Sequence, residues 1–453
     1  MKKYILNPLL ILSSPICAIA SLTSCSGDTK IVLANFESYM SSDLIDKYDN
    51  DVTFLYYQTN EEIQSKYHRY YDLAIPSTYE VISLIENKWV QKIDWSRFDL
   101  HDDDGNLITN GKEALSLFTE PIQDIIASTT TVYANLFNPS ENLLDYCIPY
   151  FLQSFMFAYK GEEIPELTNA KNWDEYTNFI GDKNNPNLPD IFKPNKTNRI
   201  GCIDDGRTFY DLCNLIKNQK LNPDDPTKWN VNPDDEQKSK SEIQKDYQFL
   251  TSKFSQNHFY FNSDSQIVLE SLAVPTDGNL SAFAYNGDIL YAAMGAEIYD
   301  PYTPDEFHID TMDAKPLALD AIVINNKNDS DPKKLDKIYS IVQSMFLDHV
   351  DNYIEDEPIS SMDDDGNFIY DPMVNFDFVR YTSPFKSIDD YVNTDYFPDI
   401  DDTLEPNQIE LYKSIYNINI NPNVDIYSLI EAPLSDLCKS NMHWAYVEER
   451  QKI

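Results

Sequence analysis

Short apolar runs alternate with amphipathic segments along the chain, a pattern that is typical of α/β proteins. Residues 31–34, 52–57 and 73–75 are apolar or rich in β-branched and aromatic side chains, and they predict buried strands. Residues 44–48 and 81–85 place apolar side chains three or four positions apart, which predicts helices with one buried face. Connections this short imply parallel strands joined by right-handed crossovers.

The third of these strands leads into a turn at residues 76–79, which is the starting point for predicting the function. Pro76 ends the strand, because proline lacks the N–H that a central strand needs. Ser77 and Thr78 then offer hydroxyls at a helix start. Ser77 and Tyr79 are therefore expected at the carboxyl end of a strand, where open α/β sheets place their ligands. The pattern alone is weak, because most strand–turn–helix units bind nothing.

The alternation continues to the end of the chain. Further strands are expected at residues 155–159, 200–203, 280–285 and 316–325. Further helices are expected at residues 173–180, 209–216, 241–254 and 333–347. Polar residues rich in Asp, Asn and Pro predict surface loops at 182–198 and 218–238. A strand as late in the chain as residues 316–325 favours two lobes built from discontinuous segments. A cleft between such lobes closes around a ligand by hinge motion.

Two acids stand out in this pattern. Asp320 lies inside an apolar strand, where a carboxylate needs a partner; a ligand ammonium would serve, and Arg380 is the rival structural partner. Asp205 follows a strand in an Asp-Asp-Gly turn, so it is either a helix cap or a ligand acceptor. Tyr285, at the end of another strand, is either core or a wall of the same site.

Net charge, cysteine and histidine spacing, and the absence of known motifs limit the classes of function that the sequence allows. Asp and Glu number 75 against 35 Lys and Arg, a net charge of −40, which would repel nucleic acid and is compatible with a cationic ligand or simply with solubility. The six cysteines and six histidines have no zinc spacing, and no nucleotide-binding or nucleophile motif occurs, so neither a metal, a cofactor nor catalysis is expected. The repeated DDDGN at 102–106 and 363–367 lacks the spacing of a calcium loop and predicts hairpin turns.

The front of the chain predicts export. Residues 1–24 have a basic start and an interrupted apolar stretch, which is typical of a secretory signal peptide. Residues 22–25, LTSC, resemble the bacterial lipobox, which implies lipidation of Cys25 and a protein tethered to the outer face of the cell membrane. The alternative is an ordinary cleaved signal with a chance cysteine.

Several short stretches, in order, resemble the bacterial spermidine/putrescine-binding proteins of ABC importers. The matching positions are 35–39, 71–79, 90–94, 145–150, 204–205, 261–264, 285–287, 320 and 381–384. The resemblance implies a two-lobed type II periplasmic-binding-protein fold and a monomer that captures a polyamine and delivers it to a permease with its ATPase. It also implies that lobe 1 comprises 30–150 and 317–383, with an acidic insertion at 355–375, and lobe 2 comprises 151–316 and 384–453.

Carried over by position, the resemblance implies a ligand site. Its residues are Phe36, Glu37, Tyr39, Ser77, Tyr79, Asp205, Tyr285, Asp320 and Tyr381. The two aspartates would accept ammonium groups, Ser77 would add a hydrogen bond, and the aromatic rings would line the methylene chain, with cation–π contacts worth ~0.5–2 kcal/mol each.

Four positions depart from the family pattern. Thr208 stands where a glutamate is usual, Ala318 where a tryptophan is usual, and Phe36 and Tyr285 also replace tryptophans. Whether Glu37 faces the cleft and replaces the missing carboxylate stays open. A different cation, such as a thiamine-like one, and a surface lipoprotein with an adhesive or interaction role are the alternatives. Facing acids and aromatics would favour binding, and a filled cleft would favour the interaction role.

Overall fold

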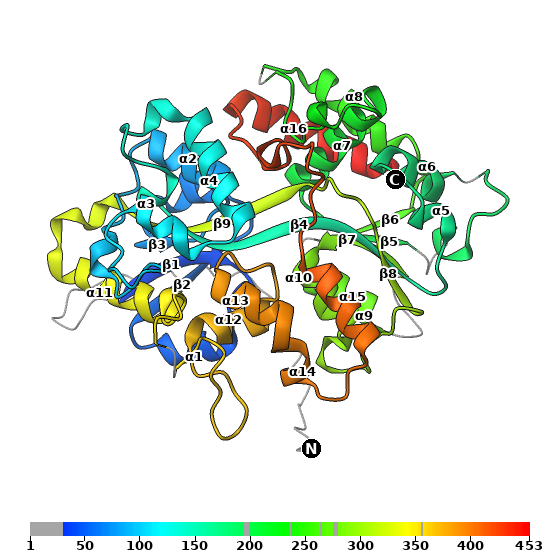
Figure 1. The fold of residues 1–453 in the computed structure, drawn as a ribbon. Coiled ribbons are helices and arrows are strands. Elements are labelled where there is room, and N and C mark those ends of the chain that lie inside the picture. The colour runs from blue at the N-terminus through cyan, green and yellow to red at the C-terminus, as the bar shows by residue number, and fades with distance from the viewer. Residues whose placement is uncertain are drawn as a thin grey trace.

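Two lobes share one continuous sheet in the computed structural model (Figure 1). The structure describes residues 30–182, 184–193, 199–235, 237–262, 265–274, 280–354 and 357–453. The predicted signal peptide, the lipidation site Cys25, residues 263–264 and the start of the acidic insertion at 355–356 lie outside these ranges. Within them, no helix is both long enough and apolar enough to cross a membrane.

Among the described residues nine strands form the sheet, in the order β2-β1-β3-β9-β4-β7-β5-β6, with β8 paired to β4. The strands are β1 (Ile31–Phe36), β2 (Val52–Tyr57), β3 (Leu73–Ala74), β4 (Ile148–Lys160), β5 (Ile200–Ile203), β6 (Phe259–Asn262), β7 (Ser281–Tyr285), β8 (Phe307–Ile309) and β9 (Leu317–Ile324). All thirteen residues of β4 and all eight of β9 are buried, because helices cover both faces of these strands. Figure 1 shows these two strands running from one lobe into the other.

The main helices are α1 (Ser42–Tyr48), α2 (Thr78–Glu86), α3 (Gly111–Ala114), α4 (Glu120–Val132), α5 (Pro165–Thr168), α6 (Trp173–Gly181), α7 (Gly206–Leu221), α8 (Lys240–Thr251), α9 (Ser265–Ala273), α10 (Asn286–Ala293), α11 (Pro332–Val342), α12 (Asp371–Val379), α13 (Lys386–Tyr391), α14 (Phe397–Ile400), α15 (Pro406–Tyr416) and α16 (Asp436–Glu449). The helices predicted by periodicity are confirmed as α6, α7, α8 and α11.

The first lobe contains β1, β2 and β3, which are parallel as predicted. β9 then pairs antiparallel with β3 on one side and with β4 on the other. In the second lobe β5 is parallel to β6 and β7, while β4 is antiparallel to β7. The prediction of a two-lobed α/β fold with a late crossing strand is confirmed.

The two DDDGN repeats are hairpin turns, as predicted. His101 pairs with Leu107, and Met362 pairs with Phe368, on either side of the two turns. Gly105 and its counterpart in the second repeat have φ of +80° and +84°, a left-handed conformation that glycine adopts at no steric cost. No group of described residues could hold a metal ion.

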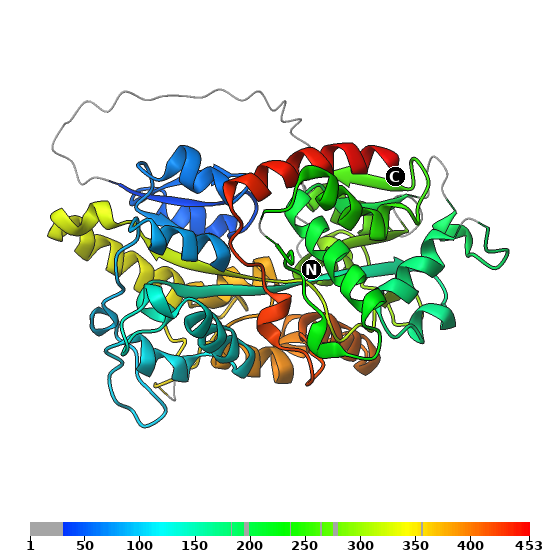
Figure 2. The ribbon, with the colours of Figure 1, turned by 90° about the horizontal axis from the view of Figure 1, so that it is seen from above.

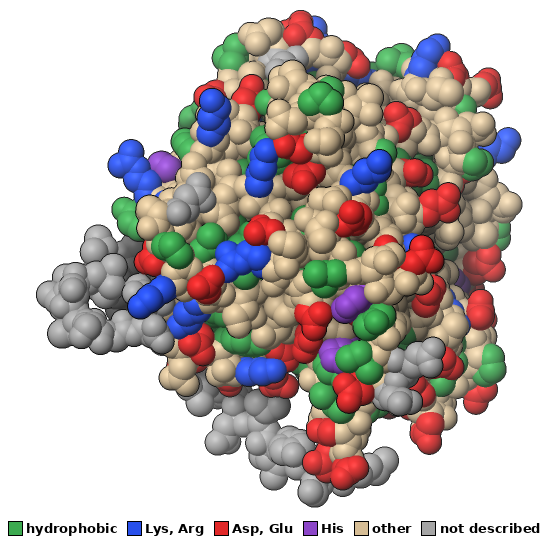
Figure 3. Space-filling model, turned by 60° about the vertical axis from the view of Figure 1, so that its left-hand side comes forward, with side chains coloured by type: hydrophobic (Ala, Val, Ile, Leu, Met, Phe, Trp, Pro, Cys, Tyr) green, Lys and Arg blue, Asp and Glu red, His purple; other side chains and the backbone are tan. Residues whose placement is uncertain are grey.

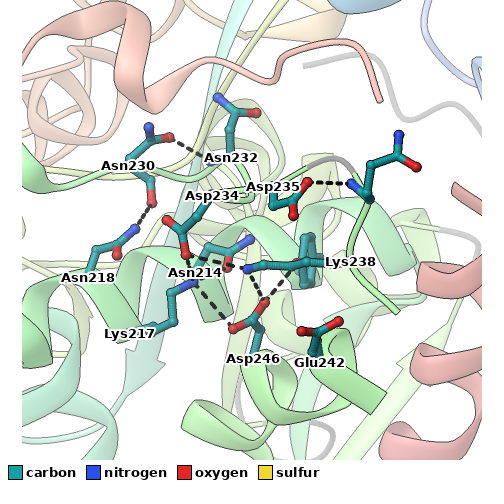
Figure 4. Close-up of polar contacts among 12 residues, drawn as sticks. Asn214, Lys217, Asn218, Asn230, Asn232, Asp234, Asp235, Lys238, Glu242 and Asp246 are labelled. Atoms are coloured by element: carbon teal, nitrogen blue, oxygen red, sulfur yellow. Dashed lines mark hydrogen bonds and ion pairs between the residues drawn. The ribbon is translucent and has the colours of Figure 1, made fainter. Parts of the chain in front are cut away.

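The segment 218–238 is more than a surface excursion, which corrects the sequence prediction. Trp229 is 5% exposed and Val231 is fully buried. Asn218 donates to the carbonyl of Asn230, and the buried Lys217 forms ion pairs with Asp234 and Asp246 (Figure 4). The polar side chains that suggested a loop are instead the partners that fasten it to α7 and α8.

Residues 425–432, which include a short 3-10 helix at Ile426–Leu429, form a segment that we call the interlobe strap. Tyr427 donates to the hydroxyl of Tyr133 at the end of α4 in the first lobe, at 3.2 Å. Ser428 donates to the carbonyl of Trp229 in the second lobe, at 2.7 Å, and accepts from the backbone N–H of Val231 at 2.9 Å. The strap therefore holds both lobes, and Figure 2 shows it passing between them before α16.

On the face drawn in Figure 3, acidic side chains are dispersed, with Lys and Arg among them. A dispersed excess of one sign keeps a protein soluble without defining a site. The functional acids must therefore be identified by burial and by their partners.

Candidate functional site

A buried polar cluster surrounds Asp320 in the middle of β9. The side chain is 2% exposed and accepts three hydrogen bonds. Its Oδ2 accepts from the Tyr39 hydroxyl at 2.8 Å and from Gln153 Nε2 at 2.6 Å, and its Oδ1 accepts from the Ser77 hydroxyl at 2.6 Å. Ser77 precedes α2, but its hydroxyl binds Asp320 instead of capping that helix, and it also accepts from Asn60 Nδ2 at 3.0 Å.

All three donors to Asp320 are neutral groups. None of the ion pairs that described residues form includes this carboxylate, and burial raises its pKa from 3.8 to about 6. Arg380, the rival partner, donates from Nε to the carbonyl of Asp377 and lies over the ring of Tyr291. Asp320 is thus a largely ionised acid at neutral pH whose charge has been desolvated without a cation, which is the state that a bound ammonium group would relieve.

A row of aromatic side chains leads from Asp320 to a second acid. The ring centroid of Tyr39 is 5.5 Å from that of Tyr381, which is 6.4 Å from that of Tyr285. The Tyr285 hydroxyl lies 2.7 Å from Thr208 Oγ1, and the N–H of Thr208 donates to Asp205 at 3.1 Å. Four residues named from the sequence are therefore neighbours in space, although they come from distant parts of the chain: Tyr39 from the turn after β1, Asp205 from the cap of α7, Tyr285 from β7 and Tyr381 from the segment after α12.

The start of α10 fixes the ring of Tyr381. The Tyr381 hydroxyl donates to Asp288 Oδ1 at 2.8 Å. A Cβ on Gly287 would come within 2.2 Å of the Tyr381 ring, so only glycine allows this approach. Asn286, fully buried, donates to Thr382 Oγ1 and holds the backbone that follows Tyr381.

Asp205 has the structural role of a helix cap. Its Oδ1 accepts from the backbone N–H groups of Arg207 at 2.6 Å and Thr208 at 3.1 Å. Among the described residues no hydrogen bond reaches Oδ2, so that atom is left for another donor. Burial raises the pKa of Asp205, and the nearby carboxylate of Glu61 raises it further. The cap and the acceptor roles are compatible because they use different oxygens.

Arg207 joins the lobes across this acid. Its guanidinium donates to both carboxylate oxygens of Asp211 at 3.1 and 3.2 Å and to Asn232 Oδ1 at 3.0 Å. The guanidinium carbon also lies 5.3 Å from the ring centroid of Tyr79, which belongs to the first lobe. Tyr79 in turn donates to Glu61 at 3.3 Å. This cation–π contact joins the second lobe to the first beside Asp205.

Phe36 and Glu37 have different surroundings. The Phe36 ring packs 4.4 Å from Tyr57 and 6.1 Å from Tyr39, so it borders the cluster. Glu37 is exposed; burial raises the pKa of Tyr56, and the charge of Glu37 raises it further. The structure thus brings together the predicted residues with the exception of Glu37, which does not replace the carboxylate missing at Thr208.

Sequence reasoning missed Gln153 and Arg207. Gln153 interrupts the apolar β4 as Asp320 interrupts β9, and its side chain donates to Asp320, so the same signal marks both. Arg207 gave no comparable signal, because an arginine in the first turn of a helix is usually at the surface.

A separate cavity of about 900 Å³ lies below the lobes. It is lined by α1, α12, the hairpin at 362–369 and the end of α14, and includes Lys47, Asp371 and Arg380. None of the predicted site residues lines it. Five aspartates do, and three of them are bound by Lys or Tyr side chains: Asp371 by Lys47 and Tyr48, Asp377 by Tyr396, and Asp399 by Tyr391.

Comparisons with known proteins agree with this fold. A family model described as "Hypothetical lipoprotein (MG045 family)" matches residues 1–403. A Listeria monocytogenes protein assigned as a spermidine/putrescine ABC transporter has a TM-score of 0.53 at 16% identity, over 93% of this chain and 98% of that one. The Tp0655 (TpPotD) lipoprotein of Treponema pallidum has a TM-score of 0.52 at 14% identity, over 93% and 99%.

Thiaminase I from Bacillus thiaminolyticus is equally similar, with a TM-score of 0.52 at 11% identity, over 93% of this chain and 100% of that one. No curated protein has a matching sequence. At these identities the structural likeness shows the fold alone, and that fold is used by solute-binding proteins and by a thiaminase.

Proposed function

The chain belongs to the MG045 family of lipoproteins, and we propose that it captures a polyamine of the spermidine/putrescine class outside the cell and delivers it to an ABC importer. The observation that carries the proposal is the row of tyrosines between two acids, Asp320 and Asp205, neither of which forms an ion pair with another described residue. A polyamine has the matching chemistry: ammonium groups for the two carboxylates, and methylenes between them for the aromatic faces.

The energetics favour a cationic solute over a neutral one. The carboxylate of Asp320 is buried among neutral donors, and burial holds its pKa at about 6. A cation beside it would restore the pKa toward its usual range and return the free energy lost to desolvation. The tyrosine hydroxyls are already used, by Asp320, Asp288 and Thr208, so the rings present faces and edges and not competing donors.

A binding role without chemistry fits the side chains of the site. The thiol nearest to it, Cys202, is 1% exposed at the end of β5. Burial, with the charges of Asp204 and Asp205, raises the pKa of that thiol, which keeps it protonated and a poor nucleophile. The lipid anchor at Cys25 would keep the protein at the outer face of the membrane beside its permease and ATPase.

Calorimetric titration of the purified, ligand-free protein tests the proposal. We expect saturable binding of spermidine, putrescine or spermine and none of a neutral diol of similar length. Thiamine is included because a bulkier cation is the alternative ligand. No heat with any amine, from protein whose folding is shown by circular dichroism, would overturn polyamine capture; saturation by thiamine alone would replace it with the alternative.

A further inference from the structure

The interlobe strap brings one more carboxylate to the site. Asn232 Nδ2 donates to the carbonyl of Ile430 at 2.8 Å, and Asn232 Oδ1 accepts from the backbone N–H of Ala432 at 2.8 Å. The residue between them, Glu431, is thereby held against the side chain that also accepts from Arg207 at 3.0 Å. A bridge between Ile430 and Leu317 ties the same point to the start of β9.

The Glu431 side chain is partly exposed and lies beside the second acid. Its carboxyl is hydrogen-bonded to that of Asp211 and lies near Arg207 and Asp205. Its charge also acts on Tyr79 of α2 and on Tyr285 of β7. It therefore lies where the two lobes and the tyrosine row meet.

This end of the site has more acid than base. Asp205, Asp211 and Glu431 are joined by Glu61, which acts on both Asp205 and Tyr79, and the guanidinium of Arg207 is the cation that faces them. Burial, with its acid neighbours, raises the pKa of Glu431 well above the usual range, and burial raises that of Asp211 to about 6. A hydrogen bond between two carboxyls requires a proton, so the pair holds one near neutral pH.

We propose that Glu431 is a specificity-determining residue that supplies the carboxylate missing at Thr208, and that an ammonium group of the solute displaces the proton shared by Glu431 and Asp211. The exchange balances: one positive charge enters with the solute, one proton leaves to water, and the charge of the site stays the same. This inference rests on the proposed function. The family match ends at residue 403, so Glu431 comes from a part of the chain outside it.

Proton displacement makes binding pH-dependent in a defined direction. As pH rises through the range in which the pair holds its proton, less work is needed to remove that proton, so affinity increases. Where the pair is already ionised, the dependence on pH disappears. If the carboxylate that accepts the ammonium group were always ionised, the affinity would not depend on pH in this way.

Calorimetry with spermidine at pH 7 in phosphate and in Tris measures the proton directly, because the two buffers differ in ionisation enthalpy. We expect wild-type protein to release roughly 0.5 to 1 proton per site. Glu431→Gln should bind about ten-fold more weakly, or worse, and release none. Glu410→Gln, the same change at an exposed position of α15, is the matched control and should behave as wild type.

Each failure points to a different premise. Binding by wild type without proton release overturns the displacement, and this measurement needs no variant to fold. Wild-type affinity and proton release in Glu431→Gln overturn the role of Glu431. Absence of binding by wild type overturns the proposed function itself, and it is seen before any variant is made.

Discussion

Replacing Asp320 by asparagine should stabilise the free protein and weaken ligand binding at the same time. The native pKa of about 6 lies above the ordinary 3.8, so the native state holds a proton that the unfolded chain releases. The charged form is therefore destabilised by ~3 kcal/mol at pH 7. The destabilisation is absent below about pH 4, grows as pH rises to about 6, and is constant above it.

Asparagine removes this charge and keeps most of the hydrogen bonds. Its oxygen can accept from Tyr39 and Gln153 in place of Oδ2, and its Nδ2 can donate to Ser77 in place of Oδ1. Because Ser77 already accepts from Asn60, the Ser77 hydroxyl proton then loses its acceptor, at a cost of about 1 kcal/mol. The net gain is about 2 kcal/mol in the free energy of unfolding at pH 7.

Ligand binding should change in the opposite direction. An ammonium group buried beside the neutral asparagine of this variant would lack its counter-charge, and loss of one partner of a buried charge pair costs roughly 2–5 kcal/mol. A value near ~3 kcal/mol corresponds to about a hundred-fold lower affinity. Urea unfolding without ligand and calorimetric titration with spermidine measure the two effects separately.

Asp310 provides a control of opposite sign. It is equally buried, but it accepts from the backbone N–H of Phe157 at 2.8 Å and pairs with Lys315 at 3.1 Å. Asp310→Asn should therefore lose stability and leave binding unchanged. Unchanged spermidine affinity in Asp320→Asn would refute its role as an acceptor, and a loss of stability at pH 7 would show that its hydrogen bonds outweigh the cost of its charge.

Three further predictions concern other parts of the chain. In Gly287→Ala the added Cβ would overlap the Tyr381 ring and displace it. We expect stability in urea unfolding to fall by about 1–3 kcal/mol and binding to weaken more than about ten-fold. Wild-type affinity in this variant would contradict a role of the tyrosine row in binding. Glu80 is fully buried with a pKa raised by burial to about 8, so wild type should lose more stability than Glu80→Gln between about pH 5 and 8; parallel pH curves of unfolding would disprove this. Cys25→Ser should move the protein from the detergent phase to the aqueous phase in Triton X-114 partitioning, and continued partition into detergent would refute lipidation.

The regular elements followed from the sequence because each depends on local periodicity. The strands β3 and β9 and the helices α6, α8 and α11 lie where apolar spacing placed them. Asp320 could also be found, since an acid in an apolar run has few explanations. The segment 218–238 could not, because its polar side chains looked exposed until the structure showed their partners on α7 and α8.

The rest of the site depends on contacts between distant residues. Arg207 and Glu431 meet through Asn232, and no local pattern links these three positions. Glu37 seemed a candidate because it was the nearest acid to a gap in the family pattern, but its side chain points to Tyr56 and solvent. Resemblance located the first acid and most of the tyrosines, and only the fold could locate the acid that comes from the strap.

The shared sheet has a consequence for how the chain folds. β9 lies between β3 and β4, so these two strands are joined only through β9, and Ile148 on β4 cannot pair until Ile322 of β9 is in place. Pairing between strands so far apart in the sequence is slow, because the entropy of closing the long intervening loop is lost before the contacts between the strands form. Until residue 324 is available, both halves keep an open strand edge, which is a site for misassembly. The two lobes are therefore a single unit during folding, and neither should survive alone as a stable fragment.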